Sequence, residues 1–327
     1  MKEYSKKEIV ENAILISQTF NTYDKKPKEL NPSPLENTEL SKDWNVVGHI
    51  TSNNGFFSDF NKDKDNEVFF GYLLQSKTNE NEYKAVVRGT ANKAEWADNF
   101  KSLMEYHKEV GWVESGFYDI YENMNLTTLD GKTTKIAEGL TKIVNEKNAH
   151  LTITGHSLGS ALSSYIMLDV SKNVKNKQNV DMCLFASPKP GNEKFSEDFQ
   201  KVTDNYVVFN YSRDLVPCVP LEVTGYEDLE NIKKITPQNA EAIIKDEVTS
   251  NHHVICYAAM LDYNAKKPEE WTKLLKDNGC EIDCIKGPTI PNAKIEFSLL
   301  DVVDKIRNVR EKIFDANKPT PLKLKRA

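Results

Sequence analysis

The sequence predicts an α/β fold, with a mostly parallel central sheet, helices on both faces and a C-terminal helical appendage. Short apolar runs typical of buried strands alternate with longer segments that carry one apolar stripe, as helices do. Parallel strands need long connections, usually helical, and these cover both faces of the sheet. A sharp turn from an apolar strand into an apolar helix near the middle of the chain supports the same fold class.

The N-terminal part of the chain predicts one helix and one hairpin. Apolar residues recur at helical spacing over residues 5–20, and the stretch 21–43, rich in Lys, Pro, Asn and Glu, predicts a loop. Strands are expected at Val68–Leu74 and Tyr83–Val87, and the polar turn between them indicates a hairpin.

The remaining elements alternate along the chain. They are a helix over 133–147, a strand over 151–154, a helix over 158–170, strands over 182–185 and 206–209, a mixed charged stretch over 221–250 and a last helix over 302–314. This order places the strand-to-helix turn inside a βαβ unit.

Composition excludes several classes of protein. The 327 residues are 39% hydrophobic, so the chain can form a core, and the net charge of −6 argues against nucleic-acid binding. No apolar run is long enough for a transmembrane helix, and the start lacks the apolar core of a signal peptide. We therefore expect a cytoplasmic protein, or one secreted by a route that needs no signal peptide. The five cysteines do not form a disulfide framework, and Cys280 and Cys284 are expected as free thiols or a local disulfide.

The strand-to-helix turn carries the strongest motif, Gly155-His156-Ser157-Leu158-Gly159. Small residues on both sides let the backbone turn sharply, which exposes a serine at the top of the sheet and at a helix N-terminus. The alternative is a tight turn with an N-capping serine, but the apolar strand and helix on either side favour a nucleophile. Ser157 is the predicted nucleophile.

A serine nucleophile needs a base, most often a histidine, and in sheets of this kind the base follows the serine in the chain. Of the six histidines, only His252 and His253 lie beyond the turn, and His156 is adjacent to Ser157 and cannot reach round to its hydroxyl. Either His252 or His253 is therefore the predicted base.

The acid that orients the histidine should lie between Ser157 and His252 in the chain. Asp214 directly follows the apolar run 206–209, at the carboxyl end of a strand, where catalytic groups gather in open α/β sheets. Pro217 and Pro220 fix the loop that carries it. Asp204 and Asp181 precede their strands, and Asp228 and Asp246 lie in the charged stretch, so Asp214 is preferred.

Acyl transfer also needs donors for a developing oxyanion. The backbone N–H of Leu158, the residue after the nucleophile, is one expected donor. The second should follow an earlier strand, and Thr90, after Val86-Val87-Arg88-Gly89, fits because the glycine permits close approach.

Taken together, these motifs resemble the class 3 lipase family, which includes the fungal triacylglycerol lipases. The resemblance covers roughly residues 1–262 and rests on motifs in the family's order: VVRGT (86–90), VESGFY (113–118), GHSLG (155–159), FASPKPGN (185–192), DLVP (214–217) and Asn251-His252 with Tyr257. It implies an α/β-hydrolase fold and favours His252 over His253 as the base. It also implies a lid over 91–100, with Glu95, Trp96 and Asn99.

The predicted function is hydrolysis of carboxylic esters, most simply of acylglycerols as in a lipase. The alternatives are a phospholipase A1-type lipid acyl hydrolase and a catalytically inactive lipase-like interaction protein. We expect a lipid or other ester substrate and transient contact with a lipid interface, but no cofactor, metal, nucleic acid or obligate protein partner. Since the predicted site spans Thr90 to His252, residues 1–265 form one expected domain, and residues 266–327 form an appendage packed on it.

Overall fold

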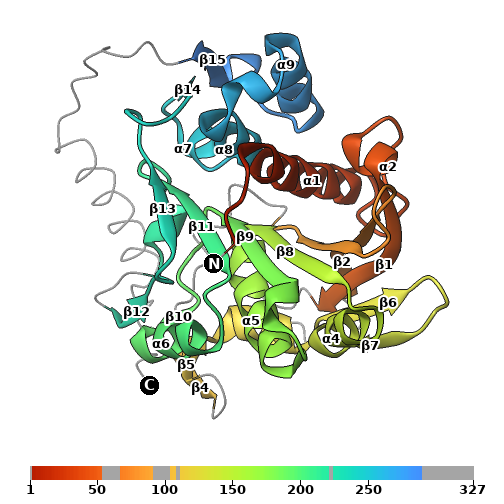
Figure 1. Cartoon of the computed structure of the whole chain (residues 1–327). Coiled ribbons are helices and arrows are strands. Elements are labelled where there is room, and N and C mark those ends of the chain that lie inside the picture. The colour runs from red at the N-terminus through yellow and green to blue at the C-terminus, as the bar shows by residue number, and fades with distance from the viewer. Residues whose placement is uncertain (1, 54–66, 91–103, 108–110, 221–223, 289–327) are drawn as a thin grey trace, which may run out of the picture.

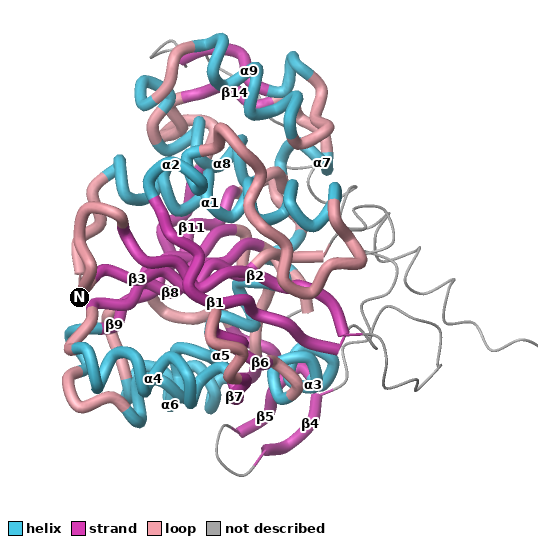
Figure 2. The backbone as a smooth tube through the Cα atoms, turned by 90° about the vertical axis from the view of Figure 1, so that its right-hand side faces the viewer, coloured by secondary structure: helices cyan, strands magenta, loops and turns pink. Residues whose placement is uncertain are grey.

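The structure is a computed structural model of the chain, and it describes residues 2–53, 67–90, 104–107, 111–220 and 224–288. The predicted helix over 302–314 and the predicted lid residues Glu95, Trp96 and Asn99 lie outside these ranges. The helices and strands form three layers, with a large sheet in the middle (Figures 1 and 2).

A nine-stranded mixed sheet forms the middle layer. Its order is β13 (Ile232–Ile235), β11 (Tyr206–Tyr211), β9 (Val180–Phe185), β8 (His150–His156), β3 (Glu82–Val87), β2 (Glu67–Ser76), β1 (Trp44–Asn53), β6 (Asn125–Thr128) and β7 (Thr133–Lys135). From β13 to β3 neighbouring strands are parallel, and from β3 to β7 they are antiparallel. The expected α/β-hydrolase fold is confirmed, and its parallel strands are concentrated in one half of the sheet.

Helices cover both faces of this sheet. One face carries α3 (Ser115–Glu122), α4 (Ile136–Lys147), α5 (Leu158–Asn173) and α6 (Glu193–Val202), and the other carries α1 (Lys6–Lys25), α2 (Glu39–Asp43) and α8 (Val254–Leu261) (Figure 2). Short α7 (Val248–Asn251) precedes α8, and α9 (Pro268–Asp277) packs beyond it.

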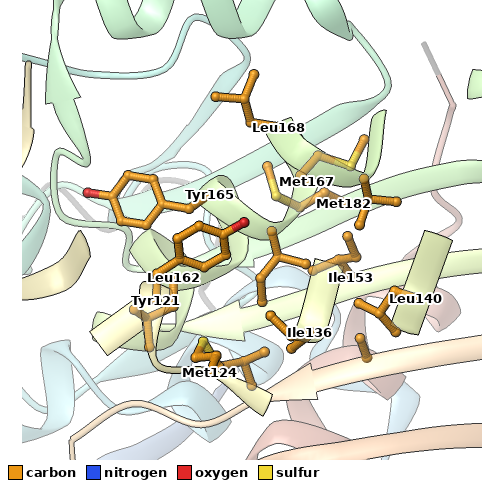
Figure 3. Packing of buried hydrophobic residues seen from close by; sticks show 14 of the residues in the cluster. Tyr121, Met124, Ile136, Leu140, Ile153, Leu162, Tyr165, Met167, Leu168 and Met182 are labelled. Carbon is orange, nitrogen blue, oxygen red and sulfur yellow. The ribbon is translucent and has the colours of Figure 1, made fainter. Parts of the chain in front are cut away.

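Side-chain alternation along the strands divides the core in two. On β9, Met182 and Leu184 face the α5 side, while Cys183 and Phe185 face the side of α1 and α8. Figure 3 shows part of the core on the α5 side of the sheet, where Leu162 of α5 packs near Ile153 of β8. Because both faces of each central strand are buried, the strands are continuous apolar runs, which is why they were predictable from sequence.

Two smaller sheets lie outside the main one. β4 (Met104–His107), β5 (Gly111–Glu114), β10 (Gly191–Asn192) and β12 (Tyr226–Glu227) form one, and β14 (Ala242–Ile244) pairs with β15 (Ile285–Pro288). Through β15 and the buried Trp271 of α9, residues 266–288 pack against the same core as α8. A domain boundary at residue 265 stays a prediction.

The elements of the structure differ from the sequence predictions in three places. The first helix continues to Lys25, and Glu39–Asp43 is helical, so the predicted loop 21–43 is shorter than expected. Residues 133–135 form β7 and not the start of a helix, because they pair with β6. The strands β1 and β6 were not predicted, because polar residues interrupt the apolar ones in both. No disulfide joins any of the five cysteines, so of the two alternatives for Cys280 and Cys284 the thiols are confirmed.

Candidate active site

The turn between β8 and α5 has the backbone of a strained elbow. Ser157 adopts φ 59° and ψ −131°, a conformation that non-glycine residues rarely adopt. A Cβ on Gly155 would lie 2.3 Å from the Gly159 carbonyl oxygen, and one on Gly159 would lie 2.5 Å from the Val87 oxygen. Both positions must therefore be glycine for the chain to turn so tightly beside β3, and the turn presents the Ser157 side chain at the end of the sheet.

The structure brings Ser157, His252 and Asp214 together. Nε2 of His252 lies 2.9 Å from Oγ of Ser157, and Nδ1 lies 2.8 Å from Oδ2 of Asp214. His253, the alternative that the sequence left open, instead accepts a hydrogen bond from the backbone N–H of Ile255 at the start of α8. The carboxylate at Nδ1 leaves Nε2 as the basic nitrogen that faces the serine hydroxyl.

A short loop after β11 fixes the carboxylate of Asp214, which is only 3% exposed. Its Oδ1 accepts a hydrogen bond from the backbone N–H of Val216 at 2.9 Å, and its own N–H donates to the Tyr211 carbonyl. Oδ2 also accepts from the hydroxyl of Tyr257 at 2.7 Å. Burial raises the pKa of Tyr257 well above its ordinary value, so this hydroxyl remains a donor. The carboxylate is thus held by donors from two elements besides the histidine.

His156 has a position that the sequence did not suggest. Its Nε2 lies 2.7 Å from the backbone carbonyl oxygen of His252, and the centroids of the two imidazole rings are 4.6 Å apart. The carbonyl is an acceptor, so Nε2 of His156 must carry the proton. His156 therefore lies behind the predicted base and contacts both its backbone and its ring.

The end of β3 lies directly beside the nucleophile. A Cβ on Gly89 would lie 2.8 Å from the His156 carbonyl oxygen and 3.1 Å from Cβ of Ser157. Thr90 follows, and its Oγ1 is buried without a hydrogen-bond partner in the described part of the chain. Leu158 is the first residue of α5, where N–H groups have no partner within the helix. The end of β3 and the start of α5, which carry the two predicted oxyanion donors, therefore both border Ser157.

The described ranges contain no group of three or more His, Cys, Asp or Glu side chains that could hold a metal ion. None of their helices combines the length and the apolar composition needed to cross a bilayer. The chemistry that these ranges offer is that of a serine, a histidine and a carboxylate in a hydrogen-bonded chain.

A strained serine at a strand-to-helix elbow, bonded to a histidine and an aspartate in this chain order, defines a serine α/β-hydrolase site. Residues 85–224 match the family model described as "Lipase (class 3)". This match agrees with the resemblance to the class 3 lipase family that the motifs indicated.

Two proteins that this chain resembles in sequence are a phospholipase and a lipase. The chain is similar to the chloroplastic phospholipase A(1) DAD1 of Arabidopsis thaliana, with 27% identity over 158 residues, which cover 45% of this chain and 35% of the relative. It is also similar to the secreted mono- and diacylglycerol lipase MDL2 of Malassezia globosa, with 32% identity over 107 residues, 32% of this chain and 35% of the relative. The chain thus spans about a third of the length of these relatives. The crystal structure of M37 lipase superimposes with a TM-score of 0.54 at 19% identity, over 85% of this chain and 96% of that one, which supports the fold.

Proposed function

We propose that this protein hydrolyses carboxylic esters of lipids, most simply acylglycerols, through an acyl-enzyme on Ser157. The observation that carries the proposal is the hydrogen-bonded series Ser157, His252 and Asp214, with separations of 2.9 and 2.8 Å. Two independent similarities support a lipid ester as the substrate, because one relative is a phospholipase and the other a mono- and diacylglycerol lipase.

In the proposed mechanism, Oγ of Ser157 attacks the ester carbonyl carbon while Nε2 of His252 takes the hydroxyl proton. Asp214 holds the imidazole and stabilises its positive charge. The N–H groups of Thr90 and Leu158 stabilise the negative oxygen of the tetrahedral intermediate. The intermediate collapses, the C–O bond to the alcohol breaks, and His252 returns the proton to the leaving alcohol. Water, activated by the same histidine, then releases the acid and restores Ser157.

A phospholipase A1 activity is the second candidate, and the similarity to the plant enzyme favours it. Both activities use the same site and differ in the head group that the substrate carries. Assays with triolein, phosphatidylcholine and p-nitrophenyl esters, run side by side, would separate a lipase from a phospholipase and from an esterase for small substrates.

The decisive variant is Ser157→Ala, which should abolish hydrolysis and labelling by a fluorophosphonate probe. Ser163→Ala is a matched control, because Ser163 is a buried serine in α5, the helix that follows Ser157, and its hydroxyl has no partner in the described ranges. The control should keep wild-type activity. Undiminished turnover in Ser157→Ala would refute the mechanism, and an unlabelled, inactive wild-type protein would favour a lipase-like interaction protein.

A further inference from the structure

The side chain of Arg88 lies immediately behind the predicted oxyanion donor. Arg88 follows β3, is 2% exposed, and directs its guanidinium back toward the sheet and not into solvent. Nε donates to the Phe69 carbonyl oxygen at 2.7 Å, and Nη1 donates to the Gly89 carbonyl oxygen at 2.8 Å. The same side chain thus joins β2 to the peptide that follows β3.

The Gly89 carbonyl and the Thr90 N–H belong to one peptide unit. In a trans peptide these two groups are coplanar and point in opposite directions. A donor that binds the carbonyl oxygen therefore fixes the direction of the N–H on the far side. Because this donor is charged, it also draws electron density toward the oxygen and strengthens the N–H as a donor.

The guanidinium is itself held firmly. Its central carbon lies 3.6 Å from the ring centroid of Tyr23 on α1 and 4.8 Å from that of Phe70 on β2. Burial lowers the pKa of Arg88 to about 10, with Tyr23 and Asp24 acting in the opposite direction. The group is therefore still charged at the pH of an ordinary assay.

We propose that Arg88 is a positioning residue that orients and polarises the Gly89–Thr90 peptide, so that the Thr90 N–H stabilises the tetrahedral oxyanion. The inference rests on the proposed ester hydrolysis and deepens it. It assigns a catalytic consequence to a side chain that does not touch the substrate. A lysine has no planar fork and cannot donate to Phe69 and Gly89 in the same geometry, so the arrangement requires arginine.

Three substitutions separate the parts of this effect. Arg88→Met removes the donors and the charge, Arg88→Gln keeps a neutral donor, and Arg88→Lys keeps the charge without the fork. Direct loss of an oxyanion donor lowers kcat about 100- to 1000-fold, and we expect the loss of its support to lower kcat about 10- to 100-fold, most in Arg88→Met. KM should change less than about threefold, since an oxyanion forms only in the transition state.

Inhibition by a trifluoromethyl ketone distinguishes this positioning role from a purely structural one, which would leave the inhibition constant unchanged. Its adduct with Ser157 carries an oxyanion, so its inhibition constant should rise in proportion to the loss of kcat/KM. Activity is normalised to active sites by end-point fluorophosphonate labelling. Partial unfolding would lower the number of labelled sites and leave the turnover of each site unchanged.

Lys84→Met is the matched control. Lys84 is also a buried cation of β3 that contacts α1, where it bonds Glu11 and Asn12, but it makes no contact with the Gly89 peptide. This variant should lose thermal stability and keep wild-type turnover per site and ketone affinity. If Arg88→Met does not fold, Arg88→Gln and Arg88→Lys carry the same comparison.

The inference is overturned if folded Arg88 variants keep kcat per labelled site within twofold of wild type, or if the loss lies entirely in KM. It is equally overturned if ketone affinity is unchanged while kcat falls. Failure of the proposed ester hydrolysis would look different, because the wild-type protein itself would then show no Ser157-dependent turnover.

Discussion

Replacing Glu114 with glutamine should stabilise the protein at neutral and alkaline pH and leave its stability unchanged near pH 4. The Glu114 side chain is fully buried where β5 meets α3. Oε2 accepts a hydrogen bond from the Phe117 backbone N–H at 2.7 Å, whereas Oε1 has no partner in the described ranges. Burial raises the pKa of this carboxyl group to about 8.

The magnitude follows from this pKa. The folded protein binds the proton more tightly than the unfolded chain, whose glutamate titrates near its ordinary value of 4.5. The free energy of unfolding therefore falls as pH rises from about 4.5 to about 8. At 1.36 kcal/mol for each unit of pKa difference, ionisation costs about 3 kcal/mol at pH 7 and up to about 5 kcal/mol above pH 8. Glutamine keeps the acceptor for Phe117 and cannot ionise.

Urea unfolding followed by circular dichroism at pH 4, 7 and 8.5 measures this difference. The variant and the wild type should have equal stability at pH 4 and diverge with rising pH, with unchanged m-values. Glu122→Gln, at an exposed position of the same helix, is the control and should show no such divergence. A gap between Glu114→Gln and wild type that does not depend on pH would refute the reasoning.

Three further variants test the arrangement of the site. Tyr257→Phe removes a hydrogen-bond donor to Asp214. It should lower kcat about tenfold, which corresponds to about 1.4 kcal/mol in the activation barrier, and leave KM unchanged. A kcat equal to that of the wild type in steady-state assays would contradict this. Gly89→Ala places a methyl group 2.8 Å from the His156 carbonyl oxygen, so the end of β3 must shift. Labelling by a fluorophosphonate should therefore slow at least about 100-fold. Labelling at the wild-type rate would show that the end of β3 does not shift. His156→Phe loses the hydrogen bond to the His252 carbonyl oxygen, whereas His156→Gln can retain it. We therefore expect a higher kcat for the glutamine variant than for the phenylalanine variant in steady-state assays. The reverse order would mean that packing of the two rings matters more than the hydrogen bond.

Features with local causes were predictable from sequence. The elbow was recognisable from residues close together in the chain, since Gly155 and Gly159 flank Ser157 and apolar runs define β8 and α5. Chain order and position at a strand end then led to Asp214 and to the pair His252 and His253. These rules hold because the carboxyl ends of parallel strands meet at one edge of a sheet.

Features with tertiary causes were not predictable. Whether His252 or His253 faces Ser157 depends on where α7 ends and α8 begins. The contacts of His156 and Arg88 join residues from different elements, and nothing in their sequence neighbourhood indicates the partners. In the sequence, Glu114 looks like any polar residue at the start of a helix, and nothing near it indicates that its carboxyl group is buried.

The position of α1 has a consequence for how the protein is made. This helix precedes the whole sheet in the chain, yet it packs against β3, β8 and α8, and α8 begins only at Val254 (Figure 1). During synthesis its apolar side, which includes Ile9, Ile14 and Leu15, can meet β2 and β3 early, but its most extensive contact, with α8, forms only after Val254 has been made. A nascent chain that stops before α7 holds Ser157 and the elbow but lacks both the base, His252, and the part of this core that α8 supplies. Part of the apolar side of α1 therefore stays exposed until after the last strand of the main sheet has been made, and during that time it is open to aggregation or to binding by a chaperone.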